Sequence, residues 1–187
     1  MIKRLLLVCL LVFPFTNSTH AASVLPLILD EIIDTSAVSF QGICTGNRTA
    51  RDPVTNFVVT YTTFEVKDVL KGNVGATHVI KQIGGIMPAG ELSFRVPGVP
   101  TFAVGQEYVV FLAGVSTAGF SSPIGLSQGQ FTIQQGETGK TVSNGRNFSE
   151  MAARVPIEDP EVSRPTAHKL GLEEFKQIAR QRVGKLP

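Results

Sequence analysis

The stretch FVVTYTTFEVKDVLKG, residues 57–72, decides the fold because it is the longest run with strand character in the chain. Its branched and aromatic side chains suit a pleated, half-buried surface, and no glycine or proline interrupts it before its last residue. Phe64 and Val66 stand on one face of the run. Glu65 and Lys67 stand on the other face, so the alternation predicts that the two apolar side chains point into the core.

The alternation slips at both ends of this run. Phe57 and Tyr61 are apolar on the face that carries Glu65, and Val69 lies beside Leu70. A strand whose buried face changes is bent, and a β-bulge is the usual device. Because long bent strands wrap around small barrels, the pattern predicts a bulged strand in a small β-barrel.

Residues 1–21 have the pattern of an export signal. Lys3 and Arg4 precede an apolar block, residues 5–15, and a short segment then ends in the small residue Ala21. The block is shorter than the roughly 20 residues that a membrane-spanning helix needs. We therefore expect cleavage after Ala21 and a secreted or periplasmic protein without a membrane span, rather than one held by a membrane anchor.

The charge balance argues against a nucleic-acid partner. The whole chain carries 17 basic and 15 acidic residues, and loss of Lys3 and Arg4 with the signal makes the two numbers equal. Nucleic-acid binding needs a clustered positive field, and no run of Lys and Arg supplies one. Neither a repeat nor a low-complexity tract divides residues 22–187, so we expect one domain, and a monomer.

Shorter runs supply the other expected elements. A short helix is predicted over residues 24–33, with Pro26 in its first turn, because apolar residues recur there at helical spacing. The polar residues 46–56, which contain Asp52, predict a long loop after the first strand. Further strands are expected, in addition to residues 57–72, at residues 37–46, 77–83, 108–113, 127–133 and 141–142.

The C-terminal part differs in composition from the strands. Residues 146–170 are polar and contain Pro156, Pro160 and Pro165, which predicts an extended strap. A final helix is expected to pack its apolar stripe on the strand at residues 108–113; the stripe comprises Leu172, Phe175, Ile178, Ala179 and Val183. The predicted organisation is a signal at residues 1–21, a β-barrel at 22–145, and a strap with a helix at 146–187.

Catalytic and metal-binding residues are sparse. Cys44 shares a strand face with Val38 and Phe40, so a small buried hydrophobe is favoured over a reactive thiol, and over a nucleophile paired with His78. His78 is expected to be a partly buried imidazole, because no second His or Cys lies at metal-site spacing from it. We expect no metal, no cofactor and no enzymatic activity.

Residues 84–106 form a long segment without periodicity, and such segments are often binding loops. Its scattered apolar residues, which include Phe102, either plug one end of the barrel or grip a ligand. Pro97 and Gly98 suit the two central positions of a type II turn, so a stiff surface is expected there. The candidate partner-binding residues are Phe94, Arg95, Pro97, Gly98 and Pro100.

Four segments carry a resemblance to known proteins. VLKG (69–72), the pair Gly84-Gly85, PGVPTFAVGQEYVVFL (97–112) and GLSQGQF (125–131) resemble a group of exported bacterial proteins without assigned function. Those proteins in turn resemble the netrin and tissue metalloprotease-inhibitor module. The resemblance implies a mainly β fold: a small OB-like five-stranded barrel with a short N-terminal helix and a longer C-terminal helix.

The inhibitor mechanism does not carry over with this resemblance. Tissue metalloprotease inhibitors chelate the protease zinc through an N-terminal cysteine, whereas the mature chain would begin Ala22-Ser23-Val24. We therefore expect a binding or interaction module at the cell envelope, with a protein or a glycan as its partner. The alternative is a protease-associated, inhibitor-like domain that works without the cysteine.

Overall fold

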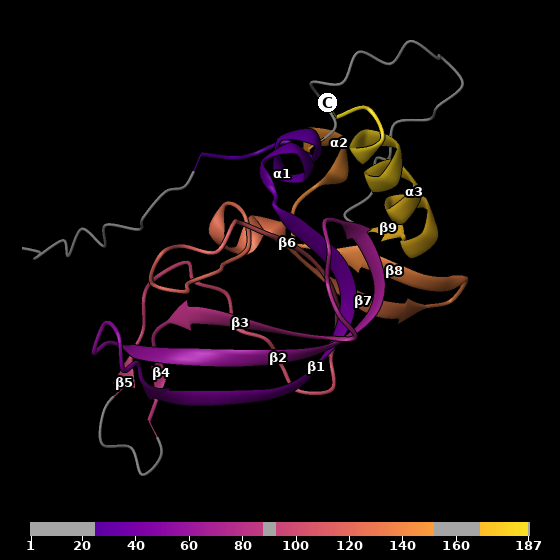
Figure 1. The fold of residues 1–187 in the computed structure, drawn as a ribbon. Coiled ribbons are helices and arrows are strands. Elements are labelled where there is room, and N and C mark those ends of the chain that lie inside the picture. The colour runs from indigo at the N-terminus through magenta and orange to yellow at the C-terminus, as the bar shows by residue number, and fades with distance from the viewer. Residues whose placement is uncertain (1–24, 88–92, 152–168, 187) are drawn as a thin grey trace, which may run out of the picture.

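The computed structural model describes residues 25–87, 93–151 and 169–186 (Figure 1). The predicted signal, the expected mature start at Ala22, and most of the predicted strap, with its three prolines, lie outside the described residues. Within these ranges no helix is both long enough and apolar enough to cross a bilayer.

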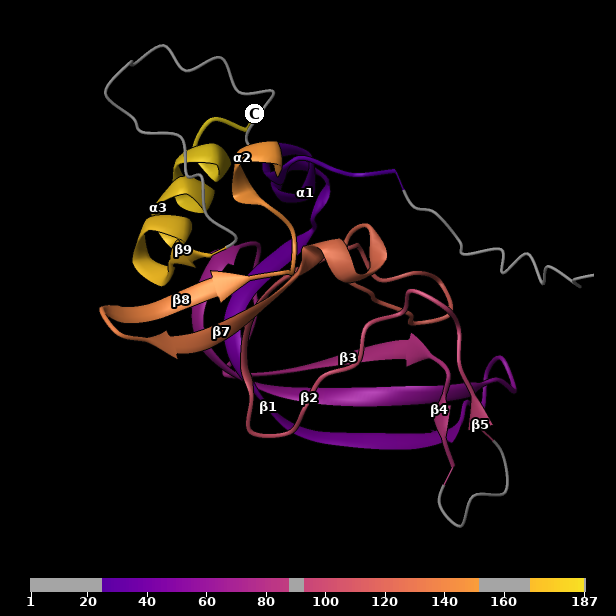
Figure 2. The same ribbon diagram turned by 180° about the vertical axis from the view of Figure 1, so that it is seen from behind.

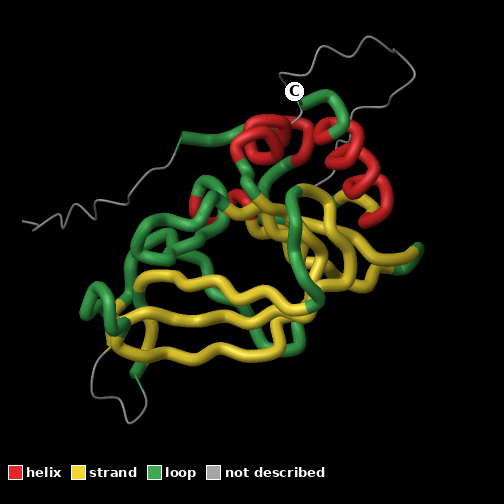
Figure 3. Tube along the Cα trace, viewed as in Figure 1, coloured by secondary structure: helices red, strands yellow, loops and turns green. Residues whose placement is uncertain are grey.

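The described strands form one seven-stranded antiparallel sheet and a separate pair of short strands, so the predicted mainly β class is confirmed (Figure 3). The order of the large sheet is β3-β2-β1-β6-β7-β8-β9. Its strands are β1 Val38–Arg51, β2 Val58–Lys71, β3 Thr77–Ile83, β6 Glu107–Leu112, β7 Gln130–Gly136, β8 Gly139–Ser143 and β9 Leu170–Gly171, and the pair is β4 Gly85–Ile86 with β5 Ser93–Phe94.

The three α-helices lie together at one end of the sheet, away from β4 and β5 (Figures 1 and 2). They are α1 Leu29–Thr35, α2 Phe148–Met151 and α3 Leu172–Val183, and a 3-10 turn, η2 Leu126–Gly129, precedes β7. The first helix begins later than predicted, so Pro26 precedes it instead of occupying its first turn. Residues 127–129 are helical where a strand was expected, and β7 starts only at Gln130.

The long hairpin of β1 and β2 is bent by bulges, as predicted from the change of buried face along residues 57–72. The pairing register shifts at three points along β1, one of them between Cys44 and Gly46. Phe64 is fully buried, and Val66 packs against the same core. The expected inward face of this strand is therefore confirmed.

The prediction of a loop over residues 46–56 is wrong for its first half, because β1 continues to Arg51. Polar pairs across the hairpin hold this extension in place. The hydroxyls of Thr49 and Thr60 lie 3.1 Å apart, and Thr62 donates a hydrogen bond to Asn47 Oδ1 at 2.7 Å. Polar residues that look like a loop in the sequence thus form a strand with matched partners.

The described strands do not close into the expected five-stranded barrel. Instead, residues 113–124 bridge the space between β6 and the edge of β3. Pro123 forms an isolated bridge with Leu112, and the Ser121 N–H donates to the Lys81 carbonyl at 3.0 Å. This segment is rich in Gly and Ser and contains Pro123, which has no N–H to extend a ladder, so single contacts take the place of a strand.

Two apolar cores lie on opposite faces of the sheet. On one face α3 packs beside β6, as predicted, with the Phe175 ring 6.0 Å from Phe111 and 4.7 Å from Phe131. The other core contains Phe40, Cys44, Phe64, Ile80, Phe102, Tyr108, Val110 and Leu112. Cys44 is fully buried there and burial raises the pKa of its thiol, which confirms that it is a core residue.

Replacement of Phe64 tests the assigned strand faces. Phe64→Ala leaves a cavity in the second core and should lower the free energy of unfolding by about 3–5 kcal/mol. Lys67→Ala removes an exposed side chain from the same strand and should change it by less than about 0.5 kcal/mol. Denaturant midpoints measure both changes. Equal losses would mean that the inward face of β2 is wrongly assigned.

Candidate functional site

A pocket of about 500 Å³ lies between one face of β1–β3 and residues 84–86 and 94–102. This volume falls within the range of about 300–1,000 Å³ that is typical of small-molecule sites. The pocket's lining residues on β1–β3 belong to the ends of these strands beside β4 and β5, and the figures show these ends on the side away from α1–α3 (Figures 1 and 2). Its lining residues are Asn47, Thr49, Thr60, Thr62, Gln82, Ile83, Gly84, Gly85, Ile86, Phe94–Val99 and Pro100–Phe102.

The floor of the pocket consists of uncharged polar side chains on three neighbouring strands: Asn47 and Thr49 on β1, Thr60 and Thr62 on β2, and Gln82 on β3. Along β2 and β3 these residues continue the face that carries the core residues Phe64 and Ile80. On β1, the bulge at Thr45 turns Asn47 and Thr49 to this same face. The inward face of the hairpin therefore changes from apolar to polar along its length.

Gly84 and Gly85 bring the backbone directly onto this floor. The Gly84 N–H donates to the Val58 carbonyl at 2.8 Å, and Thr60 Oγ1 donates to the Gly84 carbonyl at 2.7 Å. Gly85 has φ +144°, and a Cβ at this position would collide with the Thr60 hydroxyl and lie 2.6 Å from the Thr49 methyl. Only glycine allows so close an approach in this conformation.

One wall of the pocket is the segment that begins with β5. Its Phe94 side chain is 43% exposed. The Pro97-Gly98 turn has the features of the predicted type II turn, since Gly98 has φ +84° and the Val99 N–H donates to the Val96 carbonyl at 3.2 Å. A Cβ on Gly98 would lie 2.6 Å from Leu126 Cδ1, so the turn is packed against η2 rather than free in solvent.

Phe102 and Phe94 occupy different environments. Only the part of the segment around Phe102 plugs the core. Phe102 is only 4% exposed, and its ring lies edge-on to Phe64 at 5.0 Å and to Tyr108 at 5.1 Å. Asn47 Nδ2 donates to the Phe102 carbonyl at 2.7 Å, which connects the plug to the pocket floor. Phe102 thus fills the core, whereas Phe94 stays available at the pocket.

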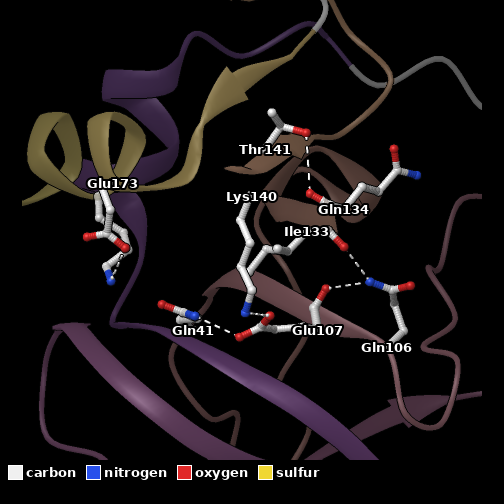
Figure 4. A network of polar contacts seen from close by, with 9 residues as sticks. Gln41, Gln106, Glu107, Ile133, Gln134, Lys140, Thr141 and Glu173 are labelled. Atoms are coloured by element: carbon white, nitrogen blue, oxygen red, sulfur yellow. Dashed lines mark hydrogen bonds and ion pairs between the residues drawn. The ribbon is translucent and has the colours of Figure 1, made fainter. Parts of the chain in front are cut away.

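The C-terminal end of the segment is fixed by a polar network around Glu107 (Figure 4). Gln106 Nε2 donates to the Ile133 carbonyl at 2.6 Å, and the Glu107 carboxylate accepts from Gln41 at 2.7 Å and from Lys140 at 2.6 Å. Burial would raise the pKa of Glu107, but the hydrogen bonds from Lys140 and Gln41 outweigh it and hold the pKa below its ordinary value.

The tip of the β1–β2 hairpin is held on the face of the sheet away from the pocket. Asp52 is 2% exposed and accepts hydrogen bonds from Lys81 Nζ at 2.8 Å, from the Tyr61 hydroxyl at 3.1 Å, and from the Thr55 N–H and hydroxyl. The Lys81 hydrogen bond, followed by those from Thr55 and Tyr61, holds the pKa of Asp52 far below its usual range.

All five candidate residues from the sequence line this one pocket: Phe94, Arg95, Pro97, Gly98 and Pro100. The polar floor was not predicted from the sequence. A signal was present, because Thr60 and Thr62 stand at positions with the same parity as Phe64, where an apolar residue would be expected.

His78 is half-buried, as predicted, and does not line the pocket. Its ring lies 5.2 Å from Phe40, and burial lowers the pKa of the imidazole. In the part of the chain that the structure describes, no three His, Cys, Asp or Glu residues are grouped so that they could hold a metal ion.

No protein-family model matches the chain, and no curated protein is significantly similar to it in sequence. The relationship to the netrin and metalloprotease-inhibitor module therefore stays a prediction.

The pKa of Asp52 makes the stability of the hairpin tip dependent on pH. Because the folded-state pKa lies below the unfolded value of about 3.9, the stabilisation is complete above that value and is lost as the pH falls. At neutral pH Asp52→Asn should therefore be less stable than the natural chain. The difference should shrink as the pH falls from about 5 to about 2. Urea midpoints across this range measure it, and a difference that stays constant or grows would contradict the assignment.

Proposed function

We propose that this protein is an exported binding module of the cell envelope and that the pocket under residues 84–86 and 94–102 is its ligand site. Export is supported by the signal pattern of residues 1–21. Binding is supported by the chemistry of the lining, which combines amide and hydroxyl groups on the floor with apolar groups on the wall. Such a combination is typical of sites that orient a ligand by hydrogen bonds.

The main support for binding is a buried polar group on the pocket floor that has no hydrogen-bond partner in the described part of the chain. Gln82 is 3% exposed, and its Nε2 has no hydrogen-bond partner among the described residues. A buried donor without a partner destabilises a protein, and buried polar groups are therefore nearly always paired. Such a breach of the packing rules is expected at functional sites, where a ligand supplies the missing partner.

The wall of the pocket is suited to binding because it is already ordered. The Pro97-Gly98 turn packs on η2, Phe102 is anchored in the core, and Gly84 is hydrogen-bonded to β2. A preformed wall reduces the conformational entropy that is lost on association. Phe94 and Arg95 are both exposed on this wall, and they provide an apolar anchor and a charged donor for the partner.

We also propose that the fold is a variant of the OB-like five-stranded barrel of the netrin-type module. In this view β1, β2, β3 and β6 supply four sides of the barrel, and residues 113–124 take the fifth position. The contacts of Ser121 with β3 and of Pro123 with β6 support this arrangement. The core that contains Phe40, Phe64 and Tyr108 then corresponds to the barrel interior.

The proposed site can be tested by capture from an envelope extract that contains both protein and glycan. The natural chain, immobilised, should retain a partner, and the double variant Phe94→Ala, Arg95→Ala should retain at least about tenfold less, as expected when anchor residues are removed. Val115→Ala is the matched control, because Val115 is also exposed but does not line the pocket. Equal thermal midpoints must show that all variants are folded. Capture that is unchanged in the folded double variant would place the binding site elsewhere.

A further inference from the structure

The hydroxyl groups of the pocket floor have already donated their hydrogens within the protein. Thr60 Oγ1 donates to the Gly84 carbonyl at 2.7 Å, so Thr49 must be the donor in the 3.1 Å contact between the two threonine hydroxyls. Thr62 donates to Asn47 Oδ1 at 2.7 Å. Since a hydroxyl has one hydrogen and two lone pairs, the oxygens of Thr49 and Thr62 remain as acceptors.

Gln82 supplies a hydrogen-bond donor next to these acceptors. Its Nε2 is a buried donor without a partner among the described residues. Gln82 pairs with Thr60 across the β2–β3 ladder, so the two side chains are direct neighbours on the same face of the sheet. The floor therefore has a donor without a partner among the described residues beside hydroxyl acceptors, and these groups are closely covered in this structure, with Gln82 3% and Thr62 1% exposed.

This pattern selects ligands that can both donate and accept. A hydroxyl group does both, and neighbouring hydroxyls can pair with the amide donor and the threonine acceptors at once. A carboxylate or a phosphate only accepts and would meet the lone pairs of Thr49 and Thr62. An ammonium group only donates and would meet the amide hydrogens of Gln82.

The wall complements a ring that has a polar edge and an apolar face. Phe94 is 43% exposed, and Ile86, on the paired strand β4, is 53% exposed. The Gly85↔Phe94 pairing fixes this aromatic ring beside the pocket, because Gly85 itself rests on the threonine floor. A sugar ring has hydroxyls at its edge and C–H groups on its faces, which matches a polar floor beside an aromatic wall.

We propose that the pocket binds a carbohydrate segment, with sugar hydroxyls on Gln82, Thr49 and Thr62 and a ring face against Phe94. This inference rests on the proposed function and names its ligand class. A peptide backbone also donates and accepts, but extended peptides are recognised mainly by main-chain pairing at a sheet edge. The floor here is made of side chains on a sheet face, which favours the carbohydrate.

The test is a titration of the full mature chain with chitobiose, cellobiose and maltose, followed by amide NMR shifts, with tetra-alanine as the peptide comparison. At least one disaccharide should shift the amide signals of residues 82–85 and 94–102 saturably. Gln82→Leu should weaken this binding by about tenfold or more, because it removes a hydrogen-bond donor to the ligand. Gln135→Leu, at an exposed position on β7, should bind as the natural chain does.

Stability separates a ligand contact from a structural role of Gln82. Because its Nε2 has no hydrogen-bond partner among the described residues, Gln82→Leu should keep or raise the thermal midpoint. Should this variant fail to fold, the amide is structural, and Thr49→Val then tests the acceptor side of the floor in the same titration.

The proposal is overturned if none of the three disaccharides binds saturably, or if the folded Gln82→Leu and Thr49→Val variants both bind as the natural chain does. Saturable binding of tetra-alanine alone would replace carbohydrate by peptide as the ligand class and leave the proposed binding function intact. Failure of that function has a different signature, namely envelope capture that does not depend on Phe94 and Arg95.

Discussion

The close contact of the Gly84-Gly85 backbone with the Thr49–Thr60 pair is the constraint on which the candidate site depends. It follows the end of β3 and holds the glycine backbone against the sheet face that forms the pocket floor. The contact needs a backbone without a Cβ on one side and short hydroxyl side chains on the other. Because β5 pairs with β4, the same contact also fixes Phe94 beside the floor.

The inward face of the β1–β3 region has two parts with different roles. Near the helices it carries the aromatic cluster of Phe40, Phe64 and Tyr108, whose edge-on packing supplies the apolar burial that stabilises the fold. Beyond Phe102 it carries hydroxyl and amide groups that contribute little apolar burial. Phe102 marks the boundary, since its ring belongs to the core and its carbonyl accepts from Asn47 of the floor. In the proposed function, structural stability and ligand binding thus belong to opposite ends of one hairpin.

The pattern of apolar residues was sufficient to predict β2, β3, β6 and α3. Each of these elements buries one face or, in β6, both faces. The extension of β1 to Arg51 escaped prediction, since a single extra residue at Thr45 reverses which side chains face inward. The polar floor was missed for a related reason: threonines in a strand look solvent-facing until a covering segment is placed over them. Closure of the sheet was also misjudged, because residues 113–124 bridge β3 and β6 through isolated contacts that leave no periodic pattern.

The pocket is shaped by glycine backbone that rests directly on the threonine pair. Gly85→Ala compared with Gly139→Ala tests this contact, since both glycines have positive φ, at +144° and +133°, but only a Cβ at Gly85 would meet neighbouring atoms. Because both variants place alanine at a positive φ, the difference between their free energies of unfolding reports the contact of the added Cβ at position 85. Urea unfolding should show that Gly85→Ala loses about 1–3 kcal/mol more than Gly139→Ala, the range seen for overpacked sites. Equal losses would contradict the account, because they would mean that the glycine pair does not rest on the floor of the pocket.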